Sequence, residues 1–319
     1  MNGPLLPLPS DGWGGGAALW LALVIDALFG EPPARLHPVV WMGRYLGWAG
    51  RQVAPPVGTV PAERFKPFMT ATLAWWAGAA IVVAGAWAIA TFAAHLHAVV
   101  AVLLVAVALK PLLAWRMLRD EVLAVEAALA VSLDAGRAQL ARLVSRDVSA
   151  LTKSEVRESA IESLAENLND SVVAPVFWFV LLGLPGAALY RYANTADAMW
   201  GYPGERNGRD WQWAGKWAAR VDDGLSWVPA RITALLLALV AWRWPRGLQR
   251  EARRTPSPNS GWPMAAMALL LDVRLGKPGT YVLNPAGRAP VAGDAQRAAT
   301  SAARVVGVLA IAAALVLAF

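Results

Sequence analysis

The feature that most constrains this chain is an apolar run, residues 68–94, that contains no charged side chain. It is longer than the roughly 20 residues that an α-helix needs to cross the hydrocarbon core of a bilayer. Because the run is continuously apolar and does not alternate, it favours a membrane helix over a strand of a β-barrel. Further candidate segments are 98–113, 172–190, 227–242 and 305–319, with a weaker one at 17–29 that contains Asp26. We therefore predict an all-α, polytopic helical membrane protein with about five membrane segments, re-entrant ones included.

The composition agrees with a membrane protein and excludes several classes of function. Hydrophobic residues make up 57% of the 319 residues and charged residues only 16%, whereas a soluble domain carries about 25% charged residues. The absence of cysteine excludes disulfides, thiolate catalysis and cysteine-based metal sites. The net charge of +7 is spread over the loops, which fits contact with anionic lipid better than binding to nucleic acid. No G-x-x-x-x-G-K-[ST], H-E-x-x-H or G-x-S-x-G pattern is present, which excludes P-loop, zincin and α/β-hydrolase chemistry.

The polar part of the chain is a set of loops within what we interpret as a single integral-membrane domain, residues 1–319. Residues 1–34 contain no Lys or Arg, so the positive-inside rule places the N-terminus outside and the following loop in the cytoplasm. The loops that carry the polar motifs are 31–67, 114–170, 191–226 and 245–304.

One candidate membrane segment, 172–190, is interrupted by Pro175, Gly183 and Pro185, which predicts a broken helix. If the segment crosses the bilayer, the loop that follows it lies outside. If the segment is re-entrant, that loop stays in the cytoplasm. The sequence leaves both topologies open.

Four acids recur at every fourth residue in the loop 114–170, namely Glu158, Glu162, Glu166 and Asp170. On a helix they form one column, in which each pair of like charges costs about 0.2–0.5 kcal/mol. None of the four has a Lys or Arg three or four residues away. We interpret the column as a site for Mg²⁺ or a cationic substrate, with a solvated helix face as the alternative. A capping-box pattern at 152–155 predicts that this helix begins there.

Two further polar stretches carry candidate binding residues. Asp26 interrupts an apolar segment, where an acid is a functional candidate, although an interfacial Asp that caps the next turn is an equal alternative. His37 follows it in the first loop. Asn194 and Asp197 are three residues apart, so they would share one face of a helix.

Arginines and acids recur together in the second half of the chain. Arg206 has the planar guanidinium that binds phosphate in bidentate fashion, and a surface pair with Glu205 is the alternative. Asp222 and Asp223 are adjacent and would point in different directions, so one of them is a candidate metal ligand. Arg231 lies in an apolar run, where a guanidinium needs an anionic partner or must reach the interface.

Five ordered blocks of the sequence carry a resemblance to a known family. The blocks are 26–42, then Arg146-Asp147 with 158–175, then 194–207, then 220–233, and last 257–266 with 273–276. Together they resemble the CobD/CbiB family of cobalamin biosynthesis, the membrane adenosylcobinamide-phosphate synthases. The resemblance covers nearly the whole chain. Two positions depart from the family pattern, because Thr255 stands where a His is expected and Asn169 where an apolar or small residue is more frequent.

The resemblance implies an ATP- and Mg²⁺-dependent ligation that joins the propionate of adenosylcobyric acid to aminopropanol phosphate and gives adenosylcobinamide phosphate. Phosphoryl transfer from ATP would form an acyl phosphate, which the amine attacks. We assign catalytic roles to Glu162, Glu166, Asp170, Asp197 and Asp222, with Glu162, Glu166 and Asp170 as the expected Mg²⁺ ligands. We expect substrate or phosphate to be bound by Asp26, His37, Arg146, Asn167, Asn194, Glu205, Arg206, Asp223, Arg231 and Asn259.

The same resemblance implies the bacterial cytoplasmic (inner) membrane as the location, with the active site on the cytoplasmic side. The implied partners are the corrinoid, the aminopropanol phosphate, membrane lipid and other membrane-associated enzymes of cobalamin assembly. Two rival classes stay open. A transporter would fit Asp26 and the broken segment 172–190, whereas a regulatory or scaffold protein of this architecture would lack ligase activity.

Overall fold

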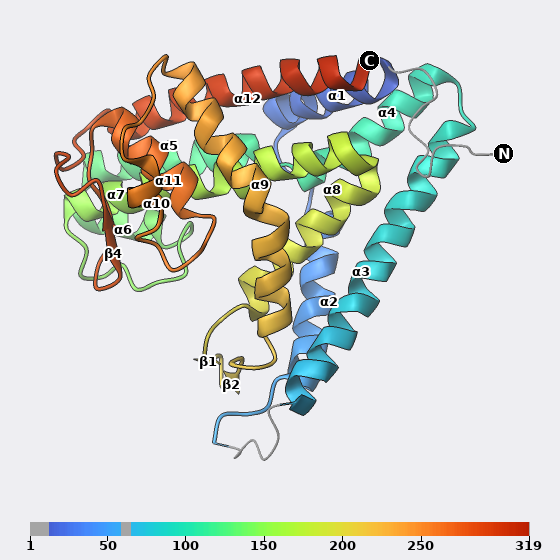
Figure 1. Cartoon of the computed structure of the whole chain (residues 1–319), viewed down its shortest axis with the longest axis horizontal. Coiled ribbons are helices and arrows are strands. Elements are labelled where there is room, and N and C mark those ends of the chain that lie inside the picture. The colour runs from blue at the N-terminus through green and yellow to red at the C-terminus, as the bar shows by residue number, and fades with distance from the viewer. Residues whose placement is uncertain (1–12, 59–64, 319) are drawn as a thin grey trace. The chain divides into compact units, whose positions relative to one another are not determined.

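The computed structural model describes residues 13–58 and 65–318, so part of the predicted loop 31–67 lies outside the described residues. The described chain is almost entirely helical, and its only strands form two short antiparallel pairs. It divides into two compact units, which Figure 1 allows the reader to trace by residue number. The first unit comprises the described residues of 1–113, 174–225 and 313–319, and the second comprises 114–173 and 226–312.

The first unit is a bundle of apolar helices. Its elements are α1 (Trp13–Phe29), α2 (Pro38–Val53), α3 (Phe65–Ala94), α4 (Ala98–Leu109), the short 3₁₀ helix η1 (Lys110–Leu112), α8 (Ala174–Trp200), the strands β1 (Glu205–Arg206) and β2 (Arg209–Asp210), and the start of α9 (Lys216–Val240). Helix α3 packs against α8 and α2, and α1 packs against α4. At the centre of this packing, the Tyr192 hydroxyl donates a hydrogen bond of 3.1 Å to the carbonyl of Trp75, and both side chains are buried.

The second unit combines helices with a small hairpin. Its elements are α5 (Trp115–Val131), α6 (Leu133–Leu140), α7 (Lys153–Leu168), the π-helical turn η2 (Asn169–Val173), the rest of α9, α10 (Leu248–Ala252), α11 (Gly261–Leu271), the strands β3 (Leu275–Lys277) and β4 (Tyr281–Leu283), and most of α12 (Asp294–Ala318). Helix α7 is central, because α5, α6, α11 and β3 all contact it.

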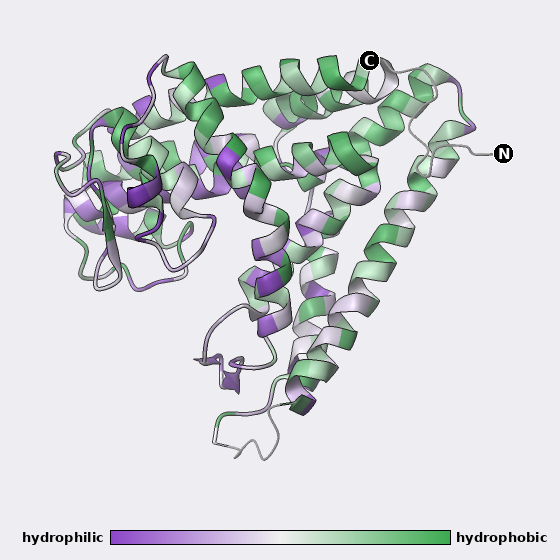
Figure 2. Ribbon diagram, in the orientation of Figure 1, coloured by the Kyte–Doolittle hydropathy of each residue, from purple (hydrophilic) through white to green (hydrophobic). Residues whose placement is uncertain are grey.

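The prediction of about five membrane segments is confirmed. Among the described residues, five helical stretches are long and apolar enough to cross a bilayer, and the green of α3 and α12 in Figure 2 follows this apolar character. They are Phe65–Ala94, Ala98–Val131, Lys153–Trp200, Lys216–Val240 and Asp294–Ala318. The weaker candidate at 17–29 forms α1, which has 17 residues and is too short for this class.

Local signals also predicted where two helices begin or break. The side chain of Thr152 accepts from the backbone of Glu155 and the Glu155 side chain accepts in return, which is the capping box that begins α7. The break in 172–190 occurs at Gly183, whose φ of 64° lies in the left-handed region that favours glycine. Pro185 follows within the next turn.

Two boundaries differ from prediction. The last helix begins at Asp294 rather than near residue 305, because polar residues extend its first turns. The loop 245–304 also contains the apolar helix α11, which we did not predict because its eleven residues are too few for a membrane segment.

Candidate functional site: a polar cavity beside helix α7

The first three acids of the column, Glu158, Glu162 and Glu166, lie on α7, which is buried on almost every side. Glu158 and Glu162 are only 2% and 5% exposed, so the solvated helix face that was the alternative reading is wrong for these two acids. Glu166 is half-buried. Ile161, Leu164 and other apolar residues of α7 are buried as well, so the carboxylates are held in a packed environment. A buried charge needs partners, because its desolvation is costly.

Those partners come from distant parts of the sequence. Arg146 contacts Glu162 with an N–O distance of 3.0 Å and also donates to the hydroxyl of Ser159 at 2.6 Å. Arg274 contacts Glu158, also at 3.0 Å. The expectation that the column lacks counter-charges is therefore wrong, because that expectation considered only neighbours on the same helix.

A tyrosine from the β3–β4 hairpin completes the surroundings of Glu162. The hydroxyl of Tyr281 donates a hydrogen bond to Glu162 Oε1. Burial raises the pKa of Tyr281, and the negative charge of Glu162 raises it further. The hydroxyl therefore stays protonated and acts as a donor to the carboxylate.

Glu162 and its partners Arg146 and Tyr281 line a polar cavity of about 350 Å³ in the second unit. Its walls come from the turn after α6, from α7, from the loop before α11 and from the β3–β4 hairpin. The polar and charged residues that line it are Ser145, Arg146, Ser159, Glu162, Ser163, Glu166, Asn167, Ser257, Ser260, Lys277 and Tyr281. We call this space the polar cavity.

The polar cavity contains both signs of charge and one unmatched donor. Glu162 and Glu166 supply negative charge, and Arg146 and Lys277 supply positive charge. The Nε of Arg146 is buried and has no hydrogen-bond partner among the described residues. Buried donors are nearly always paired in folded proteins, so an unpaired guanidinium N–H in a cavity suits an anionic group of a ligand.

Asp170, the last acid of the column, does not line this cavity. It lies in η2, where Asn169 Nδ2 donates to its Oδ1 at 2.8 Å. Among the described residues, no three His, Asp or Glu side chains lie close enough together to hold a metal ion. Mg²⁺ is commonly held by one or two carboxylates while phosphate oxygens and water fill its other positions, so Glu162 and Glu166 fit it. The assignment of Mg²⁺ to this column stays a prediction.

The predicted residues of the block 194–223 lie in the first unit. Asn194 Nδ2 donates to Asp222 Oδ1 at 3.5 Å, and Asp223 is half-buried on the same helix as Asp222. The Oδ1 of Asp197 lies too close to Gly201 to leave room for a Cβ there, so a larger residue at that position would displace the side chain of Asp197.

The hairpin β1–β2 of the first unit carries the other two predicted residues of this block. The guanidinium of Arg206 stacks on the ring of Tyr202, 3.5 Å from its centroid, and Glu205 is exposed. Arg206 and Glu205 form no ion pair with each other within the described chain. Because this block and the acid column belong to different units, the shared site predicted from them stays a prediction.

Asp26 and His37 join a second charged group in the first unit, together with Glu31 and Lys110. Lys110 Nζ lies 3.4 Å from Asp26 and 2.9 Å from Glu31, and His37 Nε2 lies 2.9 Å from the same oxygen of Glu31. His37 also caps α2 by accepting from the backbone N–H of Val39. We call these four residues the buried charge cluster, since Asp26 and Lys110 are almost inaccessible to solvent.

Arg231 has partners that the sequence did not predict. Its Nη1 donates to Asn259 Oδ1 at 2.6 Å, and its Nη2 donates to the carbonyl of Pro258 at 3.1 Å. The rings of Trp227 and Trp262 lie 4.4 and 4.7 Å from the guanidinium carbon. Neutral oxygens and aromatic faces thus surround the guanidinium, and its contact with a substrate phosphate stays a prediction.

Comparison with known proteins decides the family. The model of the CobD/Cbib protein family matches residues 19–311. The chain belongs to the CobD/CbiB family. A relative named probable cobalamin biosynthesis protein CobD, from Methanothermobacter thermautotrophicus, is 42% identical over 84% of this chain and 86% of its own. Relatives named cobalamin biosynthesis protein CobD from Brucella suis and Halalkalibacterium halodurans are 38% and 37% identical, over 82% and 83% of this chain and 82% of their own chains. No solved structure matches the chain.

The two departures from the CobD/CbiB pattern have local explanations. Asn169 is buried and accepts a hydrogen bond of 3.1 Å from Thr233 while it donates to Asp170, so its polar side chain is satisfied. The hydroxyl of Thr255 donates to the carbonyls of Ala252 and Ser257, which fixes the loop before α11. Neither residue lines the polar cavity.

Sequence reasoning missed several residues of this CobD/CbiB protein that the structure brings to the charged sites. They are Glu31, Lys110, Ser257, Ser260, Arg274, Lys277 and Tyr281. One signal was available for Lys110, because it is a lone cation at the end of an apolar run. For Tyr281 no local pattern exists, since its partner is 119 residues away.

Proposed function

We propose that this protein is an adenosylcobinamide-phosphate synthase, which joins adenosylcobyric acid to aminopropanol phosphate in an ATP-dependent ligation. Membership of the CobD/CbiB family and the names of its relatives support a role in cobalamin biosynthesis. The observation that carries the finer proposal is the polar cavity, which combines two carboxylates, two cations and an unpaired buried N–H in one space.

Such a lining suits phosphorylated and amine-bearing ligands. Arg146 and Lys277 would bind phosphate oxygens, and the free Nε of Arg146 is a donor ready for one of them. Glu162 and Glu166 would hold Mg²⁺, which would neutralise phosphate charge when bound. Tyr281 would fix the carboxylate of Glu162 in place by its hydrogen bond.

The reaction asks the protein for orientation and for a proton acceptor. ATP would supply the phosphoryl group that makes the propionate oxygen a leaving group. The amine nitrogen then forms the C–N bond, the phosphate leaves, and the ammonium proton passes to a carboxylate. We assign this last role to Asp197 or Asp222, and we place the active site on the cytoplasmic side of the membrane.

The direct test incubates the detergent-purified protein with adenosylcobyric acid, aminopropanol phosphate, Mg²⁺ and ATP, and detects the amide by mass spectrometry. Product is expected only when all four are present. Failure of the folded protein to form the amide with all four present would reject the ligase and favour the transporter or scaffold classes. Uptake of substrate by proteoliposomes without ATP turnover would identify the transporter.

A further inference from the structure

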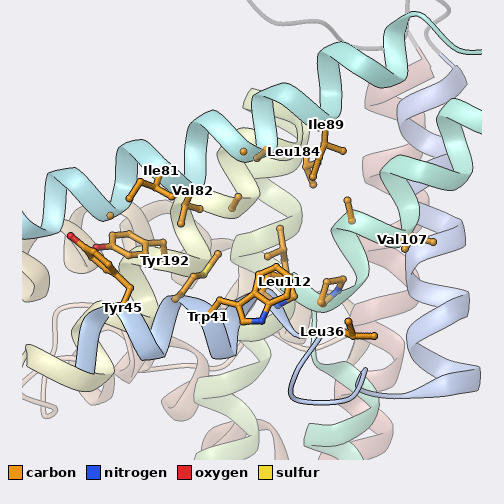
Figure 3. A pocket seen from close by; sticks show the side chains of 18 residues that line it. Leu36, Trp41, Tyr45, Ile81, Val82, Ile89, Val107, Leu112, Leu184 and Tyr192 are labelled. Carbon is orange, nitrogen blue, oxygen red and sulfur yellow. The ribbon is translucent and has the colours of Figure 1, made fainter. Parts of the chain in front are cut away.

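A second cavity in the molecule has a different character and lies entirely in the first unit. It is an apolar groove of about 440 Å³ between α2, α3, α4 and α8 (Figure 3). The figure shows Tyr45 and Tyr192 toward one end of the groove and Leu36 and Val107 toward the other, with Ile81 of α3 along its side. We call this space the apolar groove.

The groove exists because small residues leave a gap between the helices. Gly85 of α3 lines it, and a Cβ built at Gly85 meets no atom within 4 Å. Ala86, Ala108 and Ala188 line it as well. A groove that the chain does not fill with its own side chains exposes apolar surface, unless another molecule covers it.

The tyrosine hydroxyls at one end of the groove already have hydrogen-bond partners within the described chain. The Tyr45 hydroxyl donates to the carbonyl of Ala74 at 2.7 Å, and the Tyr192 hydroxyl donates to the carbonyl of Trp75 at 3.1 Å. The two hydroxyls are thus already used by α3. The occupant that fits such walls is a hydrocarbon chain rather than a polar metabolite.

Residues on the rim of the groove are themselves exposed. The side chains of Ile81, Val107 and Trp41 are 65%, 59% and 51% exposed, and each also lines the groove. Ile81 and Val107 belong to helical stretches that can cross a membrane. The groove therefore opens onto surface that lipid chains contact, which selects lipid as the source of the hydrocarbon chain.

The helix that forms one wall also carries unmatched positive charge. Arg44 and Arg51 of α2 are exposed, and α2 contains no acid. Within the described residues, neither arginine forms an ion pair with a carboxylate. They are seven residues apart and share a face with the exposed Trp48, next to the face that lines the groove. Arginine beside tryptophan is typical of the headgroup level of a membrane.

We propose that the apolar groove binds an anionic phospholipid, with one acyl chain along the groove between α2, α3, α4 and α8 and the phosphate at Arg44. The acyl chain covers apolar surface that the helices leave open. The guanidinium provides a bidentate contact to the phosphate. This inference does not depend on the proposed ligase activity, because lipid binding is measured without turnover.

The experiment uses the full chain, purified in detergent and stripped of lipid. Palmitoyl-oleoyl phosphatidylglycerol, or the phosphatidylcholine with the same chains, is added, and native mass spectrometry measures bound lipid against concentration. The wild type is expected to bind one phosphatidylglycerol more tightly than the others. Gly85→Leu places a side chain at a position that lines the groove and where a Cβ meets no atom within 4 Å. It is expected to weaken that binding on the order of tenfold, since it displaces several buried methylenes.

The matched control is Gly307→Leu, because Gly307 of α12 also has open space around it but does not line the groove. It is expected to leave lipid binding unchanged. Ala108→Leu is a second groove-filling variant, used if Gly85→Leu has a lowered melting temperature. Arg44→Gln is expected to bind phosphatidylglycerol and phosphatidylcholine with equal affinity, because it lacks the guanidinium at the phosphate. Unchanged binding by a folded groove-filling variant, a retained preference in Arg44→Gln, or no tight lipid in the wild type would each overturn the proposal.

Discussion

Two of the buried charge groups in the described chain differ in what surrounds them. In the buried charge cluster of the first unit, Lys110 lies between Asp26 and Glu31, and its side chain is almost inaccessible to solvent. In the second unit, the pair of Arg146 and Glu162 lines a cavity of about 350 Å³.

The difference shows why an ion pair alone does not identify a functional site. Removing one partner of a buried pair is costly wherever it lies, because the other charge is left in a poor solvent. The pair of Arg146 and Glu162 lines accessible volume, and the Nε of Arg146 there has no hydrogen-bond partner among the described residues. We therefore expect substitutions in the buried charge cluster to reduce stability, and substitutions in the polar cavity to reduce activity.

The largest effect is expected for Lys110→Met in the buried charge cluster. It leaves two carboxylates without their shared cation and should reduce the free energy of unfolding by about 3–5 kcal/mol. The matched variant is Lys277→Met, since Lys277 is an exposed lysine that lines the polar cavity. It should change stability by less than about 0.5 kcal/mol and yet reduce ligation. Thermal unfolding in detergent measures the stability of both variants, and amide formation measures the ligation. A destabilised Lys277→Met together with a stable Lys110→Met would contradict the comparison.

A smaller effect, on activity, is expected for Glu162→Gln. The change removes the negative charge that pairs with Arg146, at some cost in stability, but keeps an oxygen that can accept from Arg146 or from Tyr281, so we expect the fold to persist. We expect kcat/KM to fall on the order of 10²–10³-fold, as when a charge-stabilising group is lost. The matched control is Glu126→Gln, because Glu126 pairs with Arg157 in the same unit but outside the cavity. Equal activity of the two variants would remove Glu162 from the mechanism.

A third variant, Tyr281→Phe, tests positioning rather than charge. Loss of one hydrogen bond to Glu162 should lower kcat/KM on the order of tenfold and leave membrane insertion intact. Because burial and the charge of Glu162 raise the pKa of Tyr281, the wild type should show no activity loss from its ionisation in the neutral to mildly alkaline range. A wild-type alkaline limb that disappears in Tyr281→Phe would contradict this.

The partners of the acids on α7 show which contacts could not be predicted from the sequence. The run 68–94, the capping box at Thr152 and the break at Gly183 were predictable, because each depends on residues that are adjacent in sequence. The pairing of Glu158 with Arg274 was not, since the two residues are 116 positions apart. A search for counter-charges on one helix cannot detect a partner that tertiary packing supplies.

The candidate site was predicted in part for the same reason. The order of the blocks brought Arg146, Glu162, Glu166 and Asn167 into one prediction, and all four line the polar cavity. Asp170 was added because it continues the column, yet η2 is a π-helical turn, so the four-residue spacing no longer keeps it on that face.

The smallest effect is expected from the pH dependence of the buried charge cluster. Burial alone would raise the pKa of Glu31, but hydrogen bonds from His37 and Lys110 and the charge of Lys110 outweigh it and lower the pKa. A carboxyl whose pKa is lower in the folded state adds stability above its unfolded pKa of about 4.3, and that stability is lost as the pH falls through the folded value. The stability difference between wild type and Glu31→Gln should therefore be constant near neutral pH and shrink below about pH 4. Thermal unfolding of both proteins across this pH range measures the stability difference. The control is Asp134→Asn, because Asp134 forms an exposed ion pair with Arg137. A difference that grows toward acid pH would mean that Glu31 is held protonated, and the buried charge cluster would then resemble a titrating site more than a structural one.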